Sequence, residues 1–340
     1  MKGSSTKGRY FITGIGGFLG SHLAEFLLAE GLTVYGTIHK DFRNVEHTKD
    51  KLALLPCDIL DRQQVETAVV KTQPQVVFHL AAQSLPVLSW KDPEATFRVN
   101  VFGTLNLLEA VRKSGIDPTI LVSGSSAEYG FTRPDEMPIQ EEKALRPATP
   151  YGVSKAAADL LAYLYWRTYG MKVICGRPFF VIGPRKRGDV CSDFARGIVA
   201  VEKGQQPSLK VGNLEAVRDF LDVQDAIGAL WLLVEKGTPG EVYNLCSGVG
   251  HKIGEVLRIL LAMAMKPVPV EQDPARLRPA DEPVVIGDNA KLRALGWQPQ
   301  VPLQVALARV LEFWRQAYDP ATPGDNTTVR HCGDRGKWQG

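Results

Sequence analysis

The 340-residue chain contains few cysteines, and their arrangement argues against a disulfide framework and a structural zinc site. The five cysteines are scattered, odd in number and never spaced as C-x-x-C, and the six histidines do not gather around them. Structural zinc needs clustered Cys and His ligands, and disulfide-rich domains need paired cysteines. The sequence therefore predicts reduced thiols in a cytoplasmic protein and no metal site.

The sequence also lacks a long apolar run and a strong excess of one charge. No stretch reaches the roughly 20 apolar residues of a membrane span, and the short, polar start of the chain does not resemble a signal peptide. With 40 basic and 37 acidic residues the net charge is +3, too small to indicate a nucleic-acid or membrane partner. A composition of 44% apolar and 23% charged residues is typical of a globular protein.

Short apolar segments alternate with longer helical ones in the first half of the chain. The predicted strands are 9–13, 32–38, 76–80 and 119–123, and the predicted helices are 21–30, 61–72 and 95–114. Strands that are apolar on both faces are typical of a parallel sheet covered by helices on both sides. We therefore predict an α/β fold with a doubly wound parallel sheet of the Rossmann type.

The regular alternation weakens after residue 177, where Gly, Pro and basic residues become common. We expect residues 8–177, with a return segment 213–245, to form the Rossmann domain. Segments 178–212 and 246–318 would form a smaller, mixed α/β substrate-binding domain that closes over the sheet edge. The polar, Gly-rich tail 319–340 is predicted to be disordered.

A glycine-rich segment, TGIGGFLG at 13–20, joins the first predicted strand to the first predicted helix. Gly14, Gly17 and Gly20 would form the turn, admit a pyrophosphate close to the backbone, and allow tight helix–strand packing. The helix N-terminus would then face the phosphates. A tight turn without a ligand is the alternative, but the strand–turn–helix context favours dinucleotide binding.

The end of the second predicted strand indicates which dinucleotide is bound. NAD enzymes usually carry an acidic residue there for the ribose hydroxyl, whereas this strand is followed by His39, Lys40 and Arg43. These cations would suit a ribose 2′-phosphate, which favours NADP. A solvated basic loop is the alternative.

A Tyr-x-x-x-Lys pair, Tyr151 and Lys155, lies near the start of a predicted helix. A four-residue spacing places both side chains on one helix face. An ammonium near the phenol should lower the tyrosine pKa toward neutrality, so that Tyr151 exchanges a proton with a carbohydrate oxygen while a nicotinamide carries hydride. The Ser-rich end of the strand at 119–123, with Ser125, precedes this pair.

Together these features resemble the extended short-chain dehydrogenase/reductase family. The residues that carry the resemblance are the segments 13–20 and 79–82, Asn100, Ser125, Tyr151 and Lys155. Within the family, the segments GSSAEYG at 124–130, GNLEAVRDF at 212–220 and RLRPAD at 276–281 resemble enzymes of GDP-mannose metabolism. The resemblance covers roughly residues 8–317 and implies an NADP-dependent oxidoreductase that takes a GDP-sugar and forms a homodimer.

The resemblance also implies a role for individual residues. Ser125 would hydrogen-bond the reacting sugar oxygen, Tyr151 would be its acid–base partner, and Lys155 would bind the nicotinamide ribose. The predicted cofactor contacts are Gly14, Gly17, Phe18, Leu19, Gly20, His39, Lys40, Arg43, Asp58, Ile59, Leu80, Ala81, Ala82, Asn100, Tyr151 and Lys155. The predicted sugar-nucleotide contacts are Gln83, Ser126, Glu128, Phe180, Arg185, Val211, Asn213, Arg218 and Arg278, of which the last two would grip the diphosphate.

The reaction depends on the residue beside Ser126. Related dehydratases carry a glutamate base two residues before the tyrosine of the Tyr-Gly pair, and here this position is Ala127. Glu128 is adjacent, but a shift of one residue should aim it differently. Because reduction of an existing 4-keto group needs no such base, we expect NADPH-dependent reduction of GDP-4-keto-6-deoxy-D-mannose to GDP-D-rhamnose, with GDP-mannose 4,6-dehydratase activity as the alternative.

One departure from the family pattern leaves further reactions open. Phe180 stands where the family commonly has an asparagine that contacts the sugar nucleotide, and a phenyl ring cannot replace the amide's hydrogen bonds. A nucleotide-sugar epimerase or isomerase is therefore a further alternative. A non-catalytic NADP-binding sensor is another, against which the joint presence of Ser125, Tyr151 and Lys155 argues.

Overall fold

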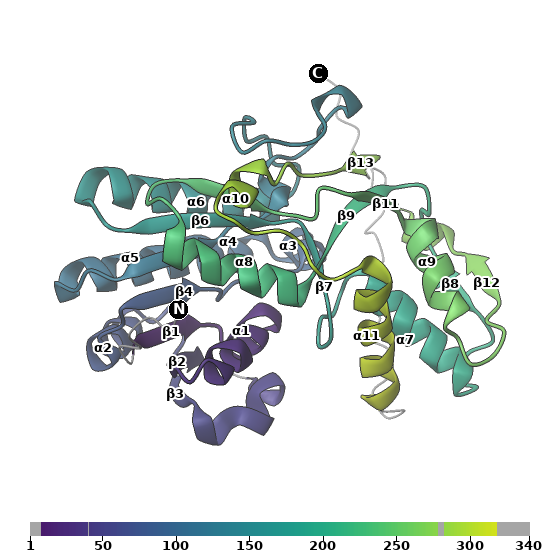
Figure 1. Cartoon of the computed structure of the whole chain (residues 1–340), viewed down its shortest axis with the longest axis horizontal. Coiled ribbons are helices and arrows are strands. Elements are labelled where there is room, and N and C mark those ends of the chain that lie inside the picture. The colour runs from purple at the N-terminus through teal and green to yellow at the C-terminus, as the bar shows by residue number, and fades with distance from the viewer. Residues whose placement is uncertain (1–7, 40, 278–281, 318–340) are drawn as a thin grey trace.

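A computed structural model describes residues 8–39, 41–277 and 282–317, and its largest element is a parallel seven-stranded sheet in the order β10-β6-β5-β4-β1-β2-β3 (Figure 1). Every neighbouring pair is parallel. The strands are β1 (Arg9–Thr13), β2 (Thr33–Ile38), β3 (Ala53–Pro56), β4 (Val76–His79), β5 (Thr119–Ser123), β6 (Val173–Pro178) and β10 (Val242–Leu245). The predicted doubly wound Rossmann sheet is confirmed, and the order reverses between β1 and β4, where such sheets bind ligands.

Helices cover both faces of this sheet and bury two hydrophobic clusters. Neighbouring strand residues point to opposite faces, so Ile12 packs with α1 and α8 while Phe11 packs with α2, α5 and α6. These helices are α1 (Phe18–Ala29), α2 (Arg62–Thr72), α5 (Gly103–Ser114), α6 (Pro150–Tyr169) and α8 (Val223–Lys236). Shorter elements between them are η1 (Arg43–Lys51), α3 (Pro86–Lys91), α4 (Pro93–Phe97), η2 (Arg98–Phe102), η3 (Ser126–Glu128) and η4 (Pro134–Glu136), and α10 (Ala290–Ala294) packs on β10.

A second group of elements lies beside the C-terminal ends of the strands of the large sheet, at the right of Figure 1. Its helices α7 (Val190–Glu202), α9 (Ile253–Ala262) and α11 (Leu303–Gln316) share a third hydrophobic cluster. Its strands are β7 (Phe180–Ile182), β9 (Val217–Asp222), β11 (Gly250–Lys252) and β13 (Val284–Val285) in one sheet, and β8 (Leu209–Val211) with β12 (Val270–Gln272) in another; η5 (Pro274–Arg276) follows β12.

The structure differs from the sequence prediction in three places. The predicted helix 95–114 is interrupted by the π-helical turn η2, and α7 forms within 178–212, where we named no individual helix. The segment 213–245 does not return as one piece, because β9 pairs with β7, β11 and β13 while α8 and β10 join the large sheet.

The tail 319–340 lies outside the described residues. Among the described helices, none is long and apolar enough to cross a membrane.

Candidate active site

The glycine-rich turn between β1 and α1 forms a cradle with no room for side chains. Gly14 has a φ of 72°, and a Cβ on it would lie 2.8 Å from the Ala81 Cα atom. A Cβ on Gly20 would lie 2.4 Å from the Gly14 carbonyl oxygen, and one on Gly16 would lie 2.2 Å from the carbonyl oxygen of Asp41. Helix α1 begins directly after the turn, at Phe18 and Leu19. Backbone N–H groups and a helix N-terminus therefore meet at a place suited to a pyrophosphate.

The chain after β4 is held against this turn by a line of hydrogen bonds. The Ala81 N–H donates to the Thr13 hydroxyl at 3.2 Å, and that hydroxyl lies 2.7 Å from His79 Nδ1. On the other side of the ring, Nε2 lies 2.9 Å from the Thr104 hydroxyl, which donates to the Asn100 carbonyl oxygen. Burial lowers the pKa of His79 to about 3, so the ring stays neutral and keeps one donor and one acceptor. The segment with Leu80 and Ala82 is thereby fixed beside the glycine cradle.

Asn100 connects this segment to helix α6. Its Oδ1 accepts the Gln83 N–H at 2.8 Å, and its Nδ2 donates to the Ser154 hydroxyl at 2.9 Å. Ser154 in turn donates to the Tyr151 carbonyl oxygen. The Gln83 amide donates to the Leu85 carbonyl oxygen at 3.1 Å, so both predicted ligand contacts also have structural partners within the protein.

Ser125, Tyr151 and Lys155 lie together at the C-terminal end of β5 and the start of α6. Ser125 follows the strand, and Tyr151 and Lys155 lie one turn apart in α6, which Thr149 caps. The Ser125 side chain lies close enough to the Tyr151 phenol to lower the pKa of this phenol, and the Lys155 ammonium donates to the Ser123 carbonyl oxygen at 2.7 Å. Ser125, Tyr151 and Lys155 are each less than a tenth exposed.

The expected lowering of the Tyr151 pKa is not observed. Burial raises the pKa of Tyr151 to about 12, and the neighbouring Ser125 side chain offsets only part of this effect. Burial also lowers the pKa of Lys155, whose ammonium is directed to Ser123. Because desolvation disfavours charge, Tyr151 is a neutral phenol and a proton donor in this structure.

Glu128, predicted to contact the sugar, points instead into the protein interior. Its carboxylate accepts the Ser125 N–H at 2.6 Å and lies 2.9 Å from Arg177 Nε. Arg177 also pairs with Asp159 at 2.7 Å, and the three side chains are almost completely buried. Burial and the neighbouring Asp159 raise the pKa of Glu128. The one-residue shift from Ala127 thus places the carboxylate beneath the active-site loop.

The basic residues after β2 have acidic neighbours in the structure. His39 lies 3.7 Å from the carboxylate of Asp58, and Arg43 makes a bidentate pair with Asp41. Such exposed pairs are weak and exchange readily for another anion. Lys40 lies outside the described residues.

The loop after β3 approaches the same region. The Asp58 carboxylate accepts the Leu60 N–H at 2.9 Å, and the Ile59 carbonyl oxygen accepts from the Asn106 amide at 3.0 Å. Ile59 packs on α5 so closely that a Cβ on Gly103 would lie 2.9 Å from it. Asp58 and Ile59 are therefore held beside the end of β2.

Two predicted sugar-nucleotide contacts, Phe180 and Arg218, are neighbours in the structure. The Arg218 guanidinium lies 5.4 Å from the centroid of the Phe180 ring, which also packs edge-on against Phe220. Arg218 donates to the carbonyl oxygens of Val217 and Glu282. Phe180 thus supports this arginine with its ring face, a role that an asparagine would not have.

The remaining predicted sugar-nucleotide contacts are dispersed. The Val211 side chain is buried in the third hydrophobic cluster, so it cannot offer its side chain to a ligand here. Asn213 accepts the Glu215 N–H at 3.0 Å, and Ser126 is half-buried in η3. Arg278 lies outside the described residues. Among the described residues, no group of His, Cys, Asp or Glu suits a metal ion.

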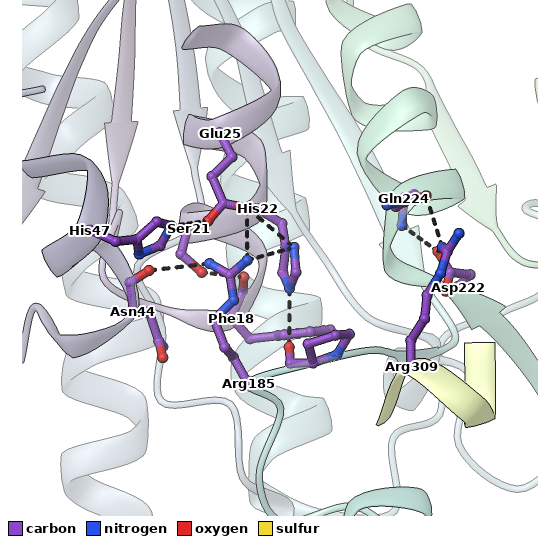
Figure 2. A network of polar contacts seen from close by, with 11 residues as sticks. Phe18, Ser21, His22, Glu25, Asn44, His47, Arg185, Asp222, Gln224 and Arg309 are labelled. Atoms are coloured by element: carbon purple, nitrogen blue, oxygen red, sulfur yellow. Dashed lines mark hydrogen bonds and ion pairs between the residues drawn. The ribbon is translucent and has the colours of Figure 1, made fainter. Parts of the chain in front are cut away.

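Arg185, also predicted to contact the substrate, reaches back to helix α1 (Figure 2). Its guanidinium pairs with Glu25 at 2.7 Å, donates to His22 Nδ1 at 3.2 Å, and donates to the Asn44 carbonyl oxygen at 3.2 Å. His22 Nε2 donates to the Pro184 carbonyl oxygen at 3.0 Å. Arg185 and Glu25 are 160 positions apart in the sequence, so no local pattern predicts their contact.

The sheet order, the glycine cradle and the Ser–Tyr–Lys set define an extended short-chain dehydrogenase/reductase. The GDP-mannose 4,6 dehydratase family model matches residues 11–310, and the chain belongs to this family.

Individual relatives within this class carry out several different reactions. GDP-6-deoxy-D-mannose reductase of Pseudomonas aeruginosa is 36% identical over 90% of this chain and 97% of its own. GDP-mannose 4,6-dehydratase of Vibrio cholerae is 28% identical over 90% and 93%. The solved structure of RMD from Pseudomonas aeruginosa complexed with NADPH has a TM-score of 0.80 at 35% identity, covering 91% of this chain and 99% of its own. Thermus thermophilus UDP-glucose 4-epimerase with NAD has a TM-score of 0.82 at 32% identity, covering 91% and 99%.

Proposed function

We propose that this protein is an NADPH-dependent reductase that converts GDP-4-keto-6-deoxy-D-mannose to GDP-D-rhamnose. The observation that carries the proposal is the composition of the loop after β5. Ala127 has no proton-abstracting group, and the adjacent carboxylate of Glu128 is buried against Arg177. A dehydratase needs a base at this place, whereas a ketone reductase does not.

The residues present fit NADPH. The side-chain-free cradle at Gly14 and Gly16 suits a pyrophosphate, and His39 and Arg43 at the end of β2 suit a 2′-phosphate in place of their exposed acidic partners. A relative from Pseudomonas aeruginosa binds NADPH on a similar fold, which supports the same choice. When bound, NADPH supplies the hydride for the reduction.

The protein's own groups would handle the proton. Tyr151, kept neutral by burial, would donate its phenolic proton to the C4 oxygen as the ketone becomes an alcohol. Ser125 would hydrogen-bond the same oxygen and hold it in line with Tyr151. Lys155 would bind the nicotinamide ribose, and Arg218 would pair with the diphosphate.

The direct test incubates the purified protein with GDP-4-keto-6-deoxy-D-mannose and NADPH, and separately with GDP-mannose, and follows the products by mass spectrometry. We expect NADPH consumption with addition of two hydrogens to the keto sugar, and no change in GDP-mannose. Loss of water from GDP-mannose would contradict the proposal and identify a dehydratase. Inactivity on both sugars would favour an epimerase or isomerase.

We further propose that the protein acts in the cytoplasm as a homodimer. The four described cysteines are buried free thiols, which suits a reducing compartment. The outer face of α6 carries the exposed apolar side chains of Leu160, Tyr163 and Leu164, which supports pairing through this helix.

A further inference from the structure

Arg185, in the loop between β7 and α7, connects this loop to helix α1 and to η1 on the dinucleotide side of the molecule. Arg185 adopts a φ of 72°, a left-handed conformation that is unfavourable for a residue other than glycine. Its side chain is only 14% exposed and contacts Glu25, His22 and Asn44 (Figure 2). Charge-assisted hydrogen bonds to a partly buried carboxylate are strong enough to hold such a backbone.

These contacts continue to the glycine cradle itself. Asn44, whose carbonyl oxygen accepts from Arg185, donates its side-chain amide to the Gly16 carbonyl oxygen at 2.9 Å. Gly16 also lies directly against the Asp41 backbone. The start of η1 thus supports the cradle from outside, and Arg185 supports the start of η1.

The hydrogen-bond roles in this cluster are fixed by chemistry. A guanidinium only donates and a carbonyl oxygen only accepts, so His22 must carry its proton on Nε2, toward Pro184, and accept from Arg185 on Nδ1. The ring is then neutral, in agreement with the lowering of the His22 pKa by burial and by Arg185. On the far side of the carboxylate, His47 of η1 pairs with Glu25 at 2.6 Å. Glu25 thus joins α1, η1 and the loop after β7.

We propose that Arg185 is a positioning residue for the dinucleotide, acting through Glu25 and Asn44 to hold the glycine cradle and η1 in their binding geometry. It does so without contacting a phosphate, because its guanidinium is already engaged by these two residues and His22. The inference rests on the dinucleotide site proposed above, but not on which sugar reaction follows. It also gives a reason for the contact between the basic loop after β7 and the elements α1 and η1 of the Rossmann domain.

The test compares NADPH dissociation constants, measured by fluorescence, for Arg185→Asn and Glu25→Gln. Asparagine tolerates a left-handed backbone, so the first variant should keep the loop intact. We expect each variant to bind NADPH about tenfold more weakly, as loss of a charged hydrogen bond would give. The double variant should be little weaker than either single one, because both remove the same contact.

Arg309→Ala is the matched control, since this arginine pairs with Asp222 and Gln224 away from α1 and η1 (Figure 2). Its NADPH affinity should equal that of the wild type, and GDP affinity should be unchanged in Glu25→Gln. If Arg185 instead held a phosphate directly, Glu25→Gln would bind NADPH as tightly as the wild type or more tightly, which would overturn the inference. Equal loss of GDP and NADPH affinity would also overturn it by indicating general damage. A wild-type protein that does not bind NADPH would overturn the dinucleotide site as well, whereas binding without reduction would contradict only the proposed reaction.

Discussion

Tyr151 reaches the active site from the first turn of α6, and its environment decides in which direction it exchanges a proton. Burial holds its pKa near 12, above the ordinary value of about 10 for tyrosine. A group whose pKa is raised keeps its proton until the pH approaches that higher value. Tyr151 is therefore suited to donate a proton, as the reduction of a ketone requires.

For this residue we predict that kcat/KM for the keto sugar stays level from neutral pH to about pH 9, because kcat/KM reports the free protein, in which the phenol remains protonated. Activity should fall only as the pH rises further toward the pKa of Tyr151. Tyr151→Phe should lose about 10²–10⁴-fold in kcat while its NADPH affinity stays close to that of the wild type. An alkaline limb near pH 7 would instead show that Lys155 lowers the tyrosine pKa, as the spacing alone suggested.

Site residues differ in how far the sequence alone predicts them. Ser125, Tyr151 and Lys155 could be predicted because each stands at a fixed place relative to a strand end or a helix start. The partners of Glu128 and Arg185 could not, since Arg177 and Glu25 are brought to them by the tertiary fold across long sequence separations. A charged residue carries no sequence signal for a partner that folding supplies.

Among the elements, replacement of glycine by alanine should have opposite effects on stability in the glycine-rich turn and in helix α8. Gly14→Ala should destabilise the protein by about 1–3 kcal/mol, because a left-handed φ and the nearby Ala81 backbone oppose a side chain. It should also abolish measurable NADPH binding. Gly228→Ala is the control: Gly228 lies within α8 with nothing near its missing Cβ, so alanine should stabilise by up to about 1 kcal/mol. Urea unfolding measures the free energy of unfolding of both variants. A loss of stability in Gly228→Ala as well as in Gly14→Ala would contradict the prediction.

Helix α7 shows why some elements escaped prediction. It begins after Asp189, whose carboxylate accepts the N–H groups of Cys191 and Ser192, directly behind a basic segment rich in Gly and Pro. Gly, Pro and basic residues are common in that segment and Gly197 lies within the helix, so the local preference for a helix is weak. Packing of Phe194 and Ile198 against α9 and α11 overrides this weak local preference.

At the scale of the whole molecule, the alternation of strands and helices was enough to predict the doubly wound sheet, because parallel strands need crossover helices. It did not predict where the chain leaves that sheet. β9 and β10 are both short strands on either side of α8 in the sequence, yet β9 pairs with β7 and β10 pairs with β6. Helix α8 connects β9 to β10, and the path of this helix decides which sheet each strand joins. The local sequence pattern does not predict that path.

An exposed apolar face on helix α6 predicts how two copies of the whole molecule pair. Leu160 is 61% exposed and Tyr163 and Leu164 are about half exposed on one side of α6, although the opposite side of this helix packs on β6 and α5. Two copies that pair through this face would bury the three side chains twice, as a two-fold interface does. Light scattering after gel filtration should therefore report a dimer for the wild type and a monomer for Leu160→Glu. Met265→Glu is the control, because Met265 is the more exposed at 76% but lies after α9, away from this face. Both variants should bind NADPH normally, since every predicted dinucleotide contact comes from one chain; a wild-type monomer, or a dimer that survives Leu160→Glu, would contradict pairing through α6.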